Sequence, residues 1–558
     1  MTADASTEPL RVRWLGRVHY RESLAVQQAL FEHGSGQHLL LVEHPHVFTH
    51  GPRADLANNL RCEPAAVGAE LVPVSRGGDV TYHGPGQLVG YPIVNVANHL
   101  GAAEHVATVE QILIDALTEL GVPGAGRFSG YAGVWLDAGT DRMRKIGAIG
   151  VRLKRGRTMH GFALNVDPDM AYLRQHIVPC GIAEYPVTSL AEEGVEVTLE
   201  RVADVVARIA GERFAAGRIE RQDVAWRHAV GDTDLAAFSR GAGPGETVRP
   251  AGDRAARRLN EAGVTAGLSI SARKPEWLRP RVQHGPEVLE LKRTIRDLDL
   301  VTVCEDAGCP NLSECWSDGT ATFMVLGERC TRACGFCLVD TRKPMAPAAD
   351  EPDRVAAAIE RMDLDHAVLT MVARDDLVDG GMAHVAACVE SIRLRRPATR
   401  VETLISDAKG DEAALDLLFG VRPDVLNHNV ETVARLQRAV RPSAGYARSL
   451  GVLARAKAAG LTTKTGFMVG LGETDDEIVG LLADLADLGV DIVTIGQYLR
   501  PTTTHLPIAR YAEPPEFERW KQIGEGFGLP HVEASPLTRS SYHAKRAADS
   551  ATPVALSR

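Results

Sequence analysis

The 558-residue sequence lacks any run of about 18 uncharged apolar residues, the length that a membrane-spanning helix needs. Residues 1–13 include Asp4 and Glu8 and no apolar stretch, so we expect no secretory leader and a cytoplasmic protein. The net charge of −10 argues against a nucleic-acid binder, whose surface would be basic. Hydrophobic residues make up 45% of the chain and charged residues 24%, which excludes a disordered or fibrous protein.

Lysine is also scarce. Ten of the 62 basic residues are lysines, and only Lys145 and Lys154 precede Lys274. Arginine stays protonated, whereas lysine can give up and take back a proton. Each lysine of the first half is therefore a candidate for catalytic proton transfer. Cysteine is unevenly placed, since six of the nine lie between Cys304 and Cys337. Without an export signal, metal binding or catalysis explains them better than disulfides do.

The chain divides at a segment rich in glycine and proline. Residues 239–272 show no sustained apolar period, so we predict domains at 1–238 and 273–558 with a linker between them. The first half combines strands at 38–42 and 90–96 with helices, which predicts an α/β domain of the α+β type.

The second half alternates strands with helices of 10–15 residues. This pattern predicts a parallel sheet, and the number of units predicts a full or partial barrel. The expected strands are 321–326, 367–372, 400–405, 424–427, 462–469 and 491–495.

Cys330, Cys334 and Cys337 place three thiols in one loop directly after the first of these strands. Three cysteines at this spacing suit three irons of a [4Fe–4S] cluster and leave the fourth iron open to S-adenosylmethionine. Zinc or unbound thiols remain the alternative, although structural zinc favours paired cysteines and four ligands. The motif resembles that of the radical SAM superfamily, which implies a partial (β/α)6 barrel of the TIM type.

A second cysteine trio and a C-terminal motif narrow the resemblance. Cys304, Cys309 and Cys315 precede the loop, and Arg539-Ser-Ser-Tyr542 stands near the end of the chain. Together they resemble lipoyl synthase over about 273–545. Further matching stretches are Arg374-Asp-Asp-Leu377, Asp379-Gly-Gly381, Asn427-His-Asn-Val-Glu-Thr432 and Thr463 to Thr474. Two stretches depart from the family, Thr370-Met371 and Ser406-Asp-Ala408.

The resemblance implies two [4Fe–4S] clusters and S-adenosylmethionine as cofactors. Cys330, Cys334 and Cys337 would hold the cluster that cleaves S-adenosylmethionine to a 5′-deoxyadenosyl radical. The second trio would hold an auxiliary cluster with Ser541 on its fourth iron, and this cluster would donate sulfide. Sulfur would enter at C6 and C8 of an octanoyl chain on a protein lysine, with electrons from a donor such as ferredoxin or flavodoxin.

The first half carries four motifs of its own. They are Arg76-Gly-Gly-Asp-Val-Thr-Tyr-His83, Lys145-Ile-Gly-Ala-Ile-Gly150, His160-Gly-Phe-Ala163 and Ile177-Val-Pro-Cys180. Glycine permits close backbone approach to a ligand, and a cation lowers the pKa of a catalytic thiol. Alone, the first motif could equally be a hairpin turn, and Cys180 an ordinary buried cysteine.

In this order the motifs resemble octanoyl-[acyl-carrier-protein]:protein N-octanoyltransferase over about 12–237, a fold shared with biotin and lipoate protein ligases. The resemblance implies that Cys180 accepts octanoyl from acyl carrier protein and that Lys145 activates it. The acyl pocket would be lined by Arg76, Gly77, Gly78, Asp79, Val80, Thr81, Tyr82, His83, Ala148, Ile149, Gly150, Gly161, Phe162 and Ala163.

The sequence thus predicts a bifunctional lipoate-biosynthesis enzyme with no nucleic-acid or membrane partner. Its acceptors would be lipoyl domains of 2-oxoacid dehydrogenase complexes or the glycine cleavage H protein. For the first half, an ATP-dependent lipoate or biotin ligase remains the alternative. For the second half, the alternatives are another sulfur-inserting radical enzyme or a metal-stabilised scaffold.

Overall fold

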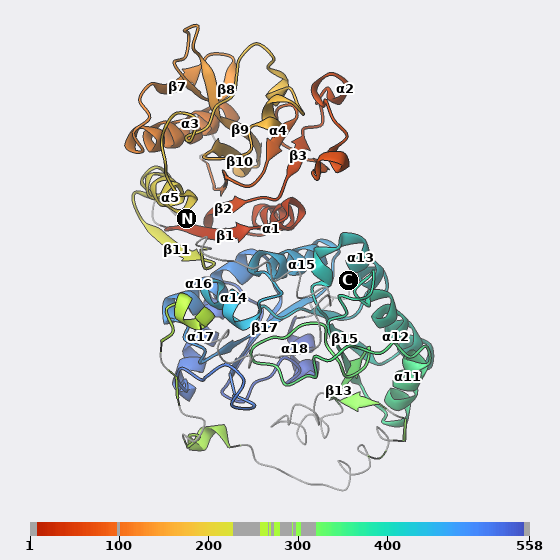
Figure 1. Ribbon diagram of the computed structural model, residues 1–558. Helices are drawn as coiled ribbons and strands as arrows, with labels where there is room; N and C mark the ends of the chain where they lie inside the picture. The colour runs from red at the N-terminus through yellow and green to blue at the C-terminus, as the bar shows by residue number, and fades with distance from the viewer. Residues whose placement is uncertain are drawn as a thin grey trace, which may run out of the picture. The chain divides into compact units, whose positions relative to one another are not determined.

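The computed structural model describes residues 8–96, 101–226, 257–265, 267–268, 273–279, 293, 297–298, 300–302 and 320–551. The chain forms two compact units, Met1–Trp226 and Arg227–Arg558 (Figure 1). The boundary expected at residue 238 and much of the expected linker, 239–272, lie outside the described residues. Residues 257–261 of that stretch are helical, and they belong to the second unit: Leu259 and Ala262 are buried, and Arg435 donates to the Ala262 carbonyl.

An eight-stranded mixed sheet forms the first unit, in the order β11-β1-β2-β6-β10-β9-β8-β7. Its strands are β1 (Leu10–Arg17), β2 (Gln37–Glu43), β6 (Gln87–Ile93), β7 (Ala125–Phe128), β8 (Tyr131–Leu136), β9 (Arg144–Lys154), β10 (Arg157–Asn165) and β11 (Ile219–Asp223). β1 runs parallel to β2 and β11, and the other pairs are antiparallel. A small second sheet contains β3 (Val47–His50), β4 (Glu70–Pro73) and β5 (Thr81–His83).

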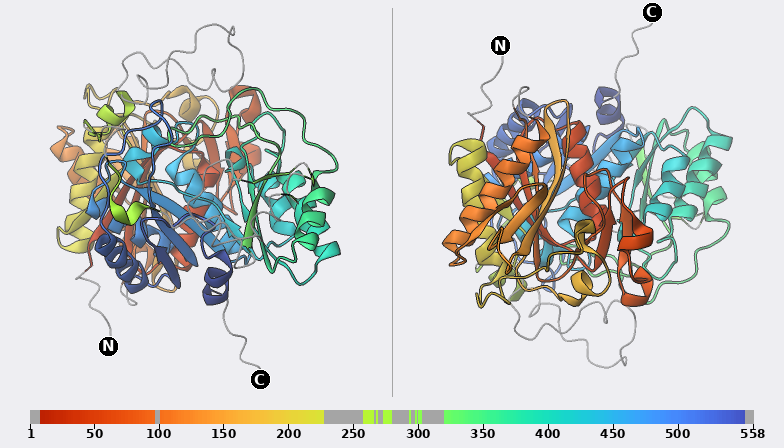
Figure 2. Two further views of the ribbon diagram at one scale, coloured as in Figure 1. Left: turned by 90° about the horizontal axis from the view of Figure 1, so that it is seen from below. Right: turned by 90° about the horizontal axis from the view of Figure 1, so that it is seen from above.

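The two faces of the large sheet differ. Helices α3 (Ala102–Glu119) and α5 (Leu199–Ala215) lie side by side and share one apolar core with the sheet (Figure 2). Leu88 of β6 belongs to that core, so alternation turns Val89 and Tyr91 to the opposite face. Helix α1 (Tyr20–Glu32) contacts β6 and β10 there. The expected α+β architecture is confirmed, and this second face carries the candidate site of the unit.

Seven parallel strands, β13–β19, dominate the second unit, and β12 (Val301–Thr302) pairs antiparallel with β13. The strands are β13 (Thr320–Val325), β14 (His366–Met371), β15 (Arg400–Leu404), β16 (Val425–Asn427), β17 (Thr463–Val469), β18 (Ile492–Gln497) and β19 (His531–Ala534). The main helices are α11 (Glu351–Arg361), α12 (Met382–Arg395), α13 (Glu412–Gly420), α15 (Tyr446–Ala458), α16 (Asp475–Asp487), α17 (Pro514–Gly526) and α18 (Ala544–Ala551).

Six strand–helix pairs followed by β19 make this unit the partial (β/α)6 barrel that the sequence predicts. The helices form a row outside the strands, with α12 between α11 and α13 (Figure 2). Helix α16 illustrates the local determinants of this pattern. The Thr474 hydroxyl accepts from the Glu477 N–H and the Glu477 carboxylate from the Thr474 N–H, which closes a capping box. Among the described helices, none is both long and apolar enough to cross a membrane.

A fully buried ion pair inside the barrel gives a stability prediction. Lys464 Nζ lies 3.0 Å from both carboxylate oxygens of Glu402. Burial alone would raise the pKa of Glu402, but Lys464, His366 and Asn427 together lower this pKa to about 2. We expect Lys464→Met to destabilise the second unit by about 3–5 kcal/mol, because Glu402 would remain buried without the positive charge of the lysine.

Hydrogen exchange of β15 and β17 in increasing urea measures this loss within the full chain. A Lys464→Met/Glu402→Leu double variant is the control, because removing both charges restores an apolar contact. Equal destabilisation by the single and the double variant would contradict the explanation.

A buried histidine makes the first unit sensitive to acid. His105 of α3 is 3% exposed, neither ring nitrogen has a hydrogen-bond partner among the residues that the structure describes, and burial lowers its pKa to about 4. Below about pH 6.5 the imidazole of His105 therefore binds a proton in the unfolded chain but not in the folded unit. We expect this residue to cost about 2 kcal/mol of stability between pH 7 and pH 5. The His105→Leu variant should lose correspondingly less in urea titrations at the two pH values; an equal loss in both proteins would be inconsistent with this cause.

Candidate active sites

Lys145 and Cys180 lie side by side in the first unit. Lys145 belongs to β9 and is 5% exposed, and its Nζ lies 3.5 Å from Cys180 Sγ. The ammonium also stands 5.2 Å from the centre of the Trp135 ring. A cation beside sulfur favours the thiolate, and the cation–π contact holds the ammonium in place. The fold has joined two residues that are 35 positions apart in the sequence.

The backbone at Cys180 is unusual. This residue occupies a single tight turn, Pro179–Gly181, with φ at 58°, and its N–H donates to the Val80 carbonyl at 2.8 Å. A residue other than glycine rarely adopts this left-handed conformation, and residues held in it are enriched at active sites and ligand clamps. The turn places Cys180 in the wall of a cavity.

The cavity has a volume of about 360 Å³. Twelve of the predicted pocket residues line it together with Lys145 and Cys180: Arg76, Gly77, Gly78, Asp79, Thr81, His83, Ala148, Ile149, Gly150, Gly161, Phe162 and Ala163. Residues that the sequence analysis did not identify complete the wall, among them Tyr20, Val89, Tyr91 and His160. Alternating apolar positions on β6 were the one signal that could have pointed to Val89 and Tyr91.

Two predicted pocket residues are absent from the lining. Val80 and Tyr82 are fully buried in a small separate core with Phe48 and Leu173. Side chains alternate along a strand, so Thr81 can face the cavity only if its neighbours Val80 and Tyr82 face away. The prediction treated the eight-residue motif as a continuous lining, whereas the strand divides it between two sides.

The glycine-rich loop is held rigidly by its own polar residues. The Arg76 guanidinium donates to the Thr49 carbonyl at 2.7 Å and to the Asp79 carbonyl at 2.9 Å. The Asp79 carboxylate accepts from the Val80 N–H at 2.6 Å and from Asn59 Nδ2 at 3.0 Å. The hydrogen bonds of both side chains thus tie the loop to itself and to neighbouring segments, and their main contribution to the cavity is its shape.

The inner wall of the cavity carries neutral imidazoles. Burial lowers the pKa of His160 to about 3 and strongly lowers that of His83. Behind the wall, His44 lies beside His83, and burial lowers its pKa to about 4. His83 Nδ1 lies 2.9 Å from Gln87 Oε1. Uncharged rings, the phenols of Tyr20 and Tyr91, and Val89 form a surface that suits an apolar chain.

In the second unit, the predicted three-cysteine loop follows β13 at the carboxyl end of the parallel strands. Cys330, Cys334 and Cys337 are partly buried free thiols. Burial, the neighbouring cysteines and Glu431 raise the pKa of Cys334 to about 12 and that of Cys337 to about 11. A cysteine binds a metal as its thiolate, so metal binding at this loop would release the protons of these thiols.

The donor set of the loop fits an iron–sulfur cluster. Three partly buried thiols stand in one loop, and each thiolate of a [4Fe–4S] cluster binds a different iron. Structural zinc takes four ligands, whereas the loop supplies three cysteines. Within the described residues, no three His, Cys, Asp or Glu side chains are arranged to hold a single metal ion.

Three segments hold the cysteine loop in place. The Thr331 N–H donates to the Ala373 carbonyl and the Gly335 N–H to the Val440 carbonyl, both at 2.9 Å. The Gly335 carbonyl accepts from the Leu506 N–H at 2.9 Å, and His505 Nε2 lies 2.9 Å from the Cys337 carbonyl. A Cβ at Gly335 would lie 2.7 Å from the Leu506 side chain, so a larger residue would displace that side chain. The polypeptide itself thus holds the backbone of the loop.

Two carboxylates at the same end of the barrel, Glu431 partly buried and Glu473 buried, were not singled out from the sequence. Glu431 follows β16 with φ at 68°, accepts from Asn429 Nδ2 at 3.1 Å, and has its pKa raised by its surroundings. Glu473 follows β17, accepts from the Leu471 N–H at 3.0 Å, and likewise has a raised pKa. Their position just after strand ends was the available signal.

The second cysteine trio, Cys304, Cys309 and Cys315, lies outside the described residues. Ser541, its predicted partner, lies in a partly buried turn just before α18. The next residues, Tyr542 and His543, stack with ring centres 3.7 Å apart.

Comparisons with known proteins find similarity for each unit. The Lipoyl protein ligase A/B catalytic domain model matches residues 19–210, and the Radical SAM superfamily model matches residues 324–495. The chain is 54% identical over 285 residues to a lipoyl synthase from Rubrobacter xylanophilus, covering 51% of this chain and 89% of that protein. It is 49% identical over 290 residues to a lipoyl synthase from Mycobacterium tuberculosis, covering 52% and 93%.

Among solved structures, a bi-partite lipoate protein ligase from Thermoplasma acidophilum matches with a TM-score of 0.34 and 18% identity, covering 39% of this chain and 88% of that one. A methylornithine synthase matches with a TM-score of 0.31 and 13% identity, covering 45% and 82%.

Proposed function

Through its C-terminal half the chain belongs to the lipoyl synthase family, and on this premise we propose that it carries out two consecutive steps of lipoate biosynthesis. The first unit would transfer octanoyl from acyl carrier protein to a lysine of a lipoyl domain. The second would insert sulfur at C6 and C8 of that octanoyl chain. The observation that carries the first assignment is the 3.5 Å approach of Lys145 Nζ to Cys180 Sγ in the wall of a largely uncharged cavity.

The acyl transfer proceeds through Cys180. Its thiolate attacks the thioester carbonyl of the donor, a thioester to Cys180 forms, and the donor leaves as a thiol that takes up a proton. The ε-amine of the acceptor lysine then attacks this second thioester, which gives the amide and regenerates the Cys180 thiolate. Lys145 is the nearest cation to the sulfur, so it stabilises the thiolate at both stages and can carry the proton between them.

An ATP-dependent ligase is the second candidate, because the matching family model is that of the Lipoyl protein ligase A/B catalytic domain. A ligase activates the acid as an adenylate and needs no nucleophilic thiol. The left-handed backbone of Cys180 and its contact with Lys145 favour the thioester route.

In the second unit, Cys330, Cys334 and Cys337 would hold the [4Fe–4S] cluster. When bound with S-adenosylmethionine and reduced, this cluster supplies the 5′-deoxyadenosyl radical that removes hydrogen from an unactivated carbon. The residues of the loop keep the three thiols at the carboxyl end of the barrel. The auxiliary cluster on Cys304, Cys309, Cys315 and Ser541, and ferredoxin or flavodoxin as electron donor, remain predictions from the family resemblance.

One experiment tests both halves in the full chain. The reconstituted protein is given octanoyl-acyl carrier protein, an apo lipoyl domain, S-adenosylmethionine and a reductant without ATP, and the lipoyl domain is weighed by mass spectrometry. We expect a gain of one octanoyl group, followed by replacement of two hydrogens by two sulfurs. Transfer that occurs only from free octanoate with ATP would identify a ligase, and an octanoyl group that gains no sulfur would refute the second assignment.

A further inference from the structure

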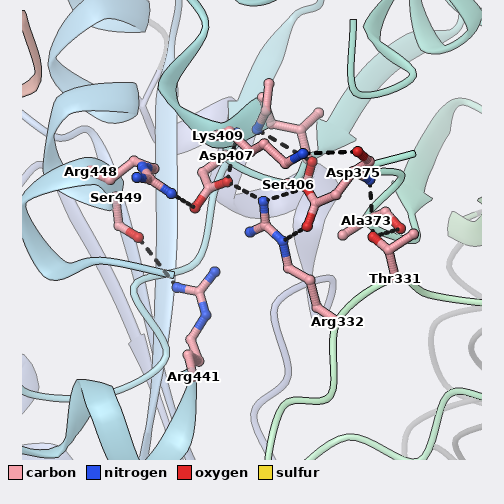
Figure 3. A network of polar contacts seen from close by, with 12 residues as sticks. Thr331, Arg332, Ala373, Asp375, Ser406, Asp407, Lys409, Arg441, Arg448 and Ser449 are labelled. Atoms are coloured by element: carbon pink, nitrogen blue, oxygen red, sulfur yellow. Dashed lines mark hydrogen bonds and ion pairs between the residues drawn. The ribbon is translucent and has the colours of Figure 1, made fainter. Parts of the chain in front are cut away.

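Arg332 lies between Cys330 and Cys334, yet its side chain serves other partners. Its guanidinium donates two hydrogen bonds to Asp375, from Nε to Oδ2 and from Nη2 to Oδ1, both at 2.8 Å. Nη2 also donates to Asp407 Oδ1 at 2.6 Å. Figure 3 shows the guanidinium between the two carboxylates.

The two carboxylates belong to different strand ends. Asp375 follows β14 and Asp407 follows β15, so a residue of the cysteine loop is tied to two neighbouring strands of the barrel. Lys409 adds a further link, since its N–H donates to Asp407 Oδ1 at 3.0 Å and its ammonium to the Asp375 carbonyl at 2.8 Å (Figure 3).

Burial makes this network strong and directional. The side chains of Arg332 and Asp407 are 5% and 0% exposed. Burial would raise the pKa of Asp407, but the positive charge of Arg332, followed by that of Arg448, lowers it strongly. A guanidinium fork matched to a carboxylate fixes geometry as well as charge, which a lysine ammonium cannot do.

We propose that Arg332 is a positioning residue, which through Asp375 and Asp407 fixes the cysteine loop to the ends of β14 and β15 and so sets where Cys330, Cys334 and Cys337 present their sulfurs. The inference rests on the proposed cluster and goes beyond it. With the three sulfurs held in one place, a cluster bound there would keep one position relative to the barrel, and S-adenosylmethionine cleavage would stay coupled to the substrate.

The test uses graded variants of the full chain. Arg332→Gln removes the whole network, Arg332→Lys keeps the charge without the fork, and Asp375→Asn leaves only the Asp407 contact at full charge. The matched control is Arg329→Gln, which removes an ion pair of the same loop with Asp340 at 3.3 Å but has no contact with the network.

We expect Arg332→Gln to speed hydrogen exchange of peptides covering 328–341 at least about tenfold in the cluster-free chain, without changing exchange in β13 or β15. In the reconstituted protein, we expect the electron paramagnetic resonance spectrum with S-adenosylmethionine to become heterogeneous. The ratio of 5′-deoxyadenosine to sulfur inserted should rise about tenfold, with smaller effects in Arg332→Lys and Asp375→Asn.

Loop exchange and spectrum indistinguishable from those of the wild type would overturn the proposal, and so would equal effects in Arg329→Gln. If Arg332→Gln also speeds the exchange of β13 and β15, the Arg332→Lys and Asp375→Asn variants provide the test. Loop exchange that is unchanged in both of these variants would overturn the proposal. A wild-type protein that binds no cluster would refute the proposed function instead. The exchange of the cluster-free loop would still test Arg332.

Discussion

Replacing Cys180 by alanine is expected to lower octanoyl transfer by at least about a thousandfold, because the thiolate that forms the intermediate is gone. In the wild-type protein, mass spectrometry should detect one octanoyl group on the chain after mixing with octanoyl-acyl carrier protein alone. The Cys180→Ala chain should remain unmodified under the same conditions. Binding of the lipoyl domain should be unchanged, since the cavity wall loses only one sulfur.

Two further variants sharpen this result. Lys145→Arg keeps a positive charge near sulfur but cannot release a proton, so it should still form the acyl-enzyme and be slow in passing the acyl group on. Cys62→Ala is the control, because Cys62 is another partly buried thiol of the same unit that does not line the cavity. Full transfer activity in Cys180→Ala would eliminate the thioester mechanism.

The second large effect is expected in the other unit. Replacing Cys334 by alanine removes one thiolate from the loop, and we expect about four fewer irons per chain after anaerobic reconstitution. Formation of 5′-deoxyadenosine should fall below detection, while octanoyl transfer by the first unit continues. Iron analysis and chromatography of the small-molecule products measure both quantities.

Cys388→Ala provides the matched control for this experiment. Cys388 is a fully buried thiol in α12, and burial raises its pKa above that of an ordinary thiol. Its loss should cost some stability through the small cavity that it leaves, but no iron. Equal iron content and equal 5′-deoxyadenosine formation in the Cys334→Ala and wild-type proteins would refute the cluster assignment.

The two units differ in how their candidate sites are assembled. In the second unit, one eight-residue stretch supplies all three thiols, so a local motif reveals the ligands directly. In the first unit, the nucleophile and its cation come from a turn and a strand that are distant in the chain. Either motif alone had an ordinary structural explanation, and only the family resemblance connected them.

The sequence alone predicted the architecture and named the candidate cluster ligands. Helical and strand periodicity gave the alternating elements of the second unit, since each element carries its own pattern of apolar residues. Spacing within a loop gave Cys330, Cys334 and Cys337, because the chain itself limits how far these thiols can separate. Small elements such as the turn at Pro179–Gly181 left no such pattern.

Only the tertiary structure decided which side chains share a site. Alternation on β5 sends Thr81 to the cavity and Tyr82 into a separate core, a division that depends on which face of the strand is covered. The partners of Arg332 lie about 40 and 75 residues away, and nothing local marks either aspartate as its partner. Parallel strands bring their carboxyl ends together whatever their separation in the chain, and this is why the sequence could name the loop but not what holds it.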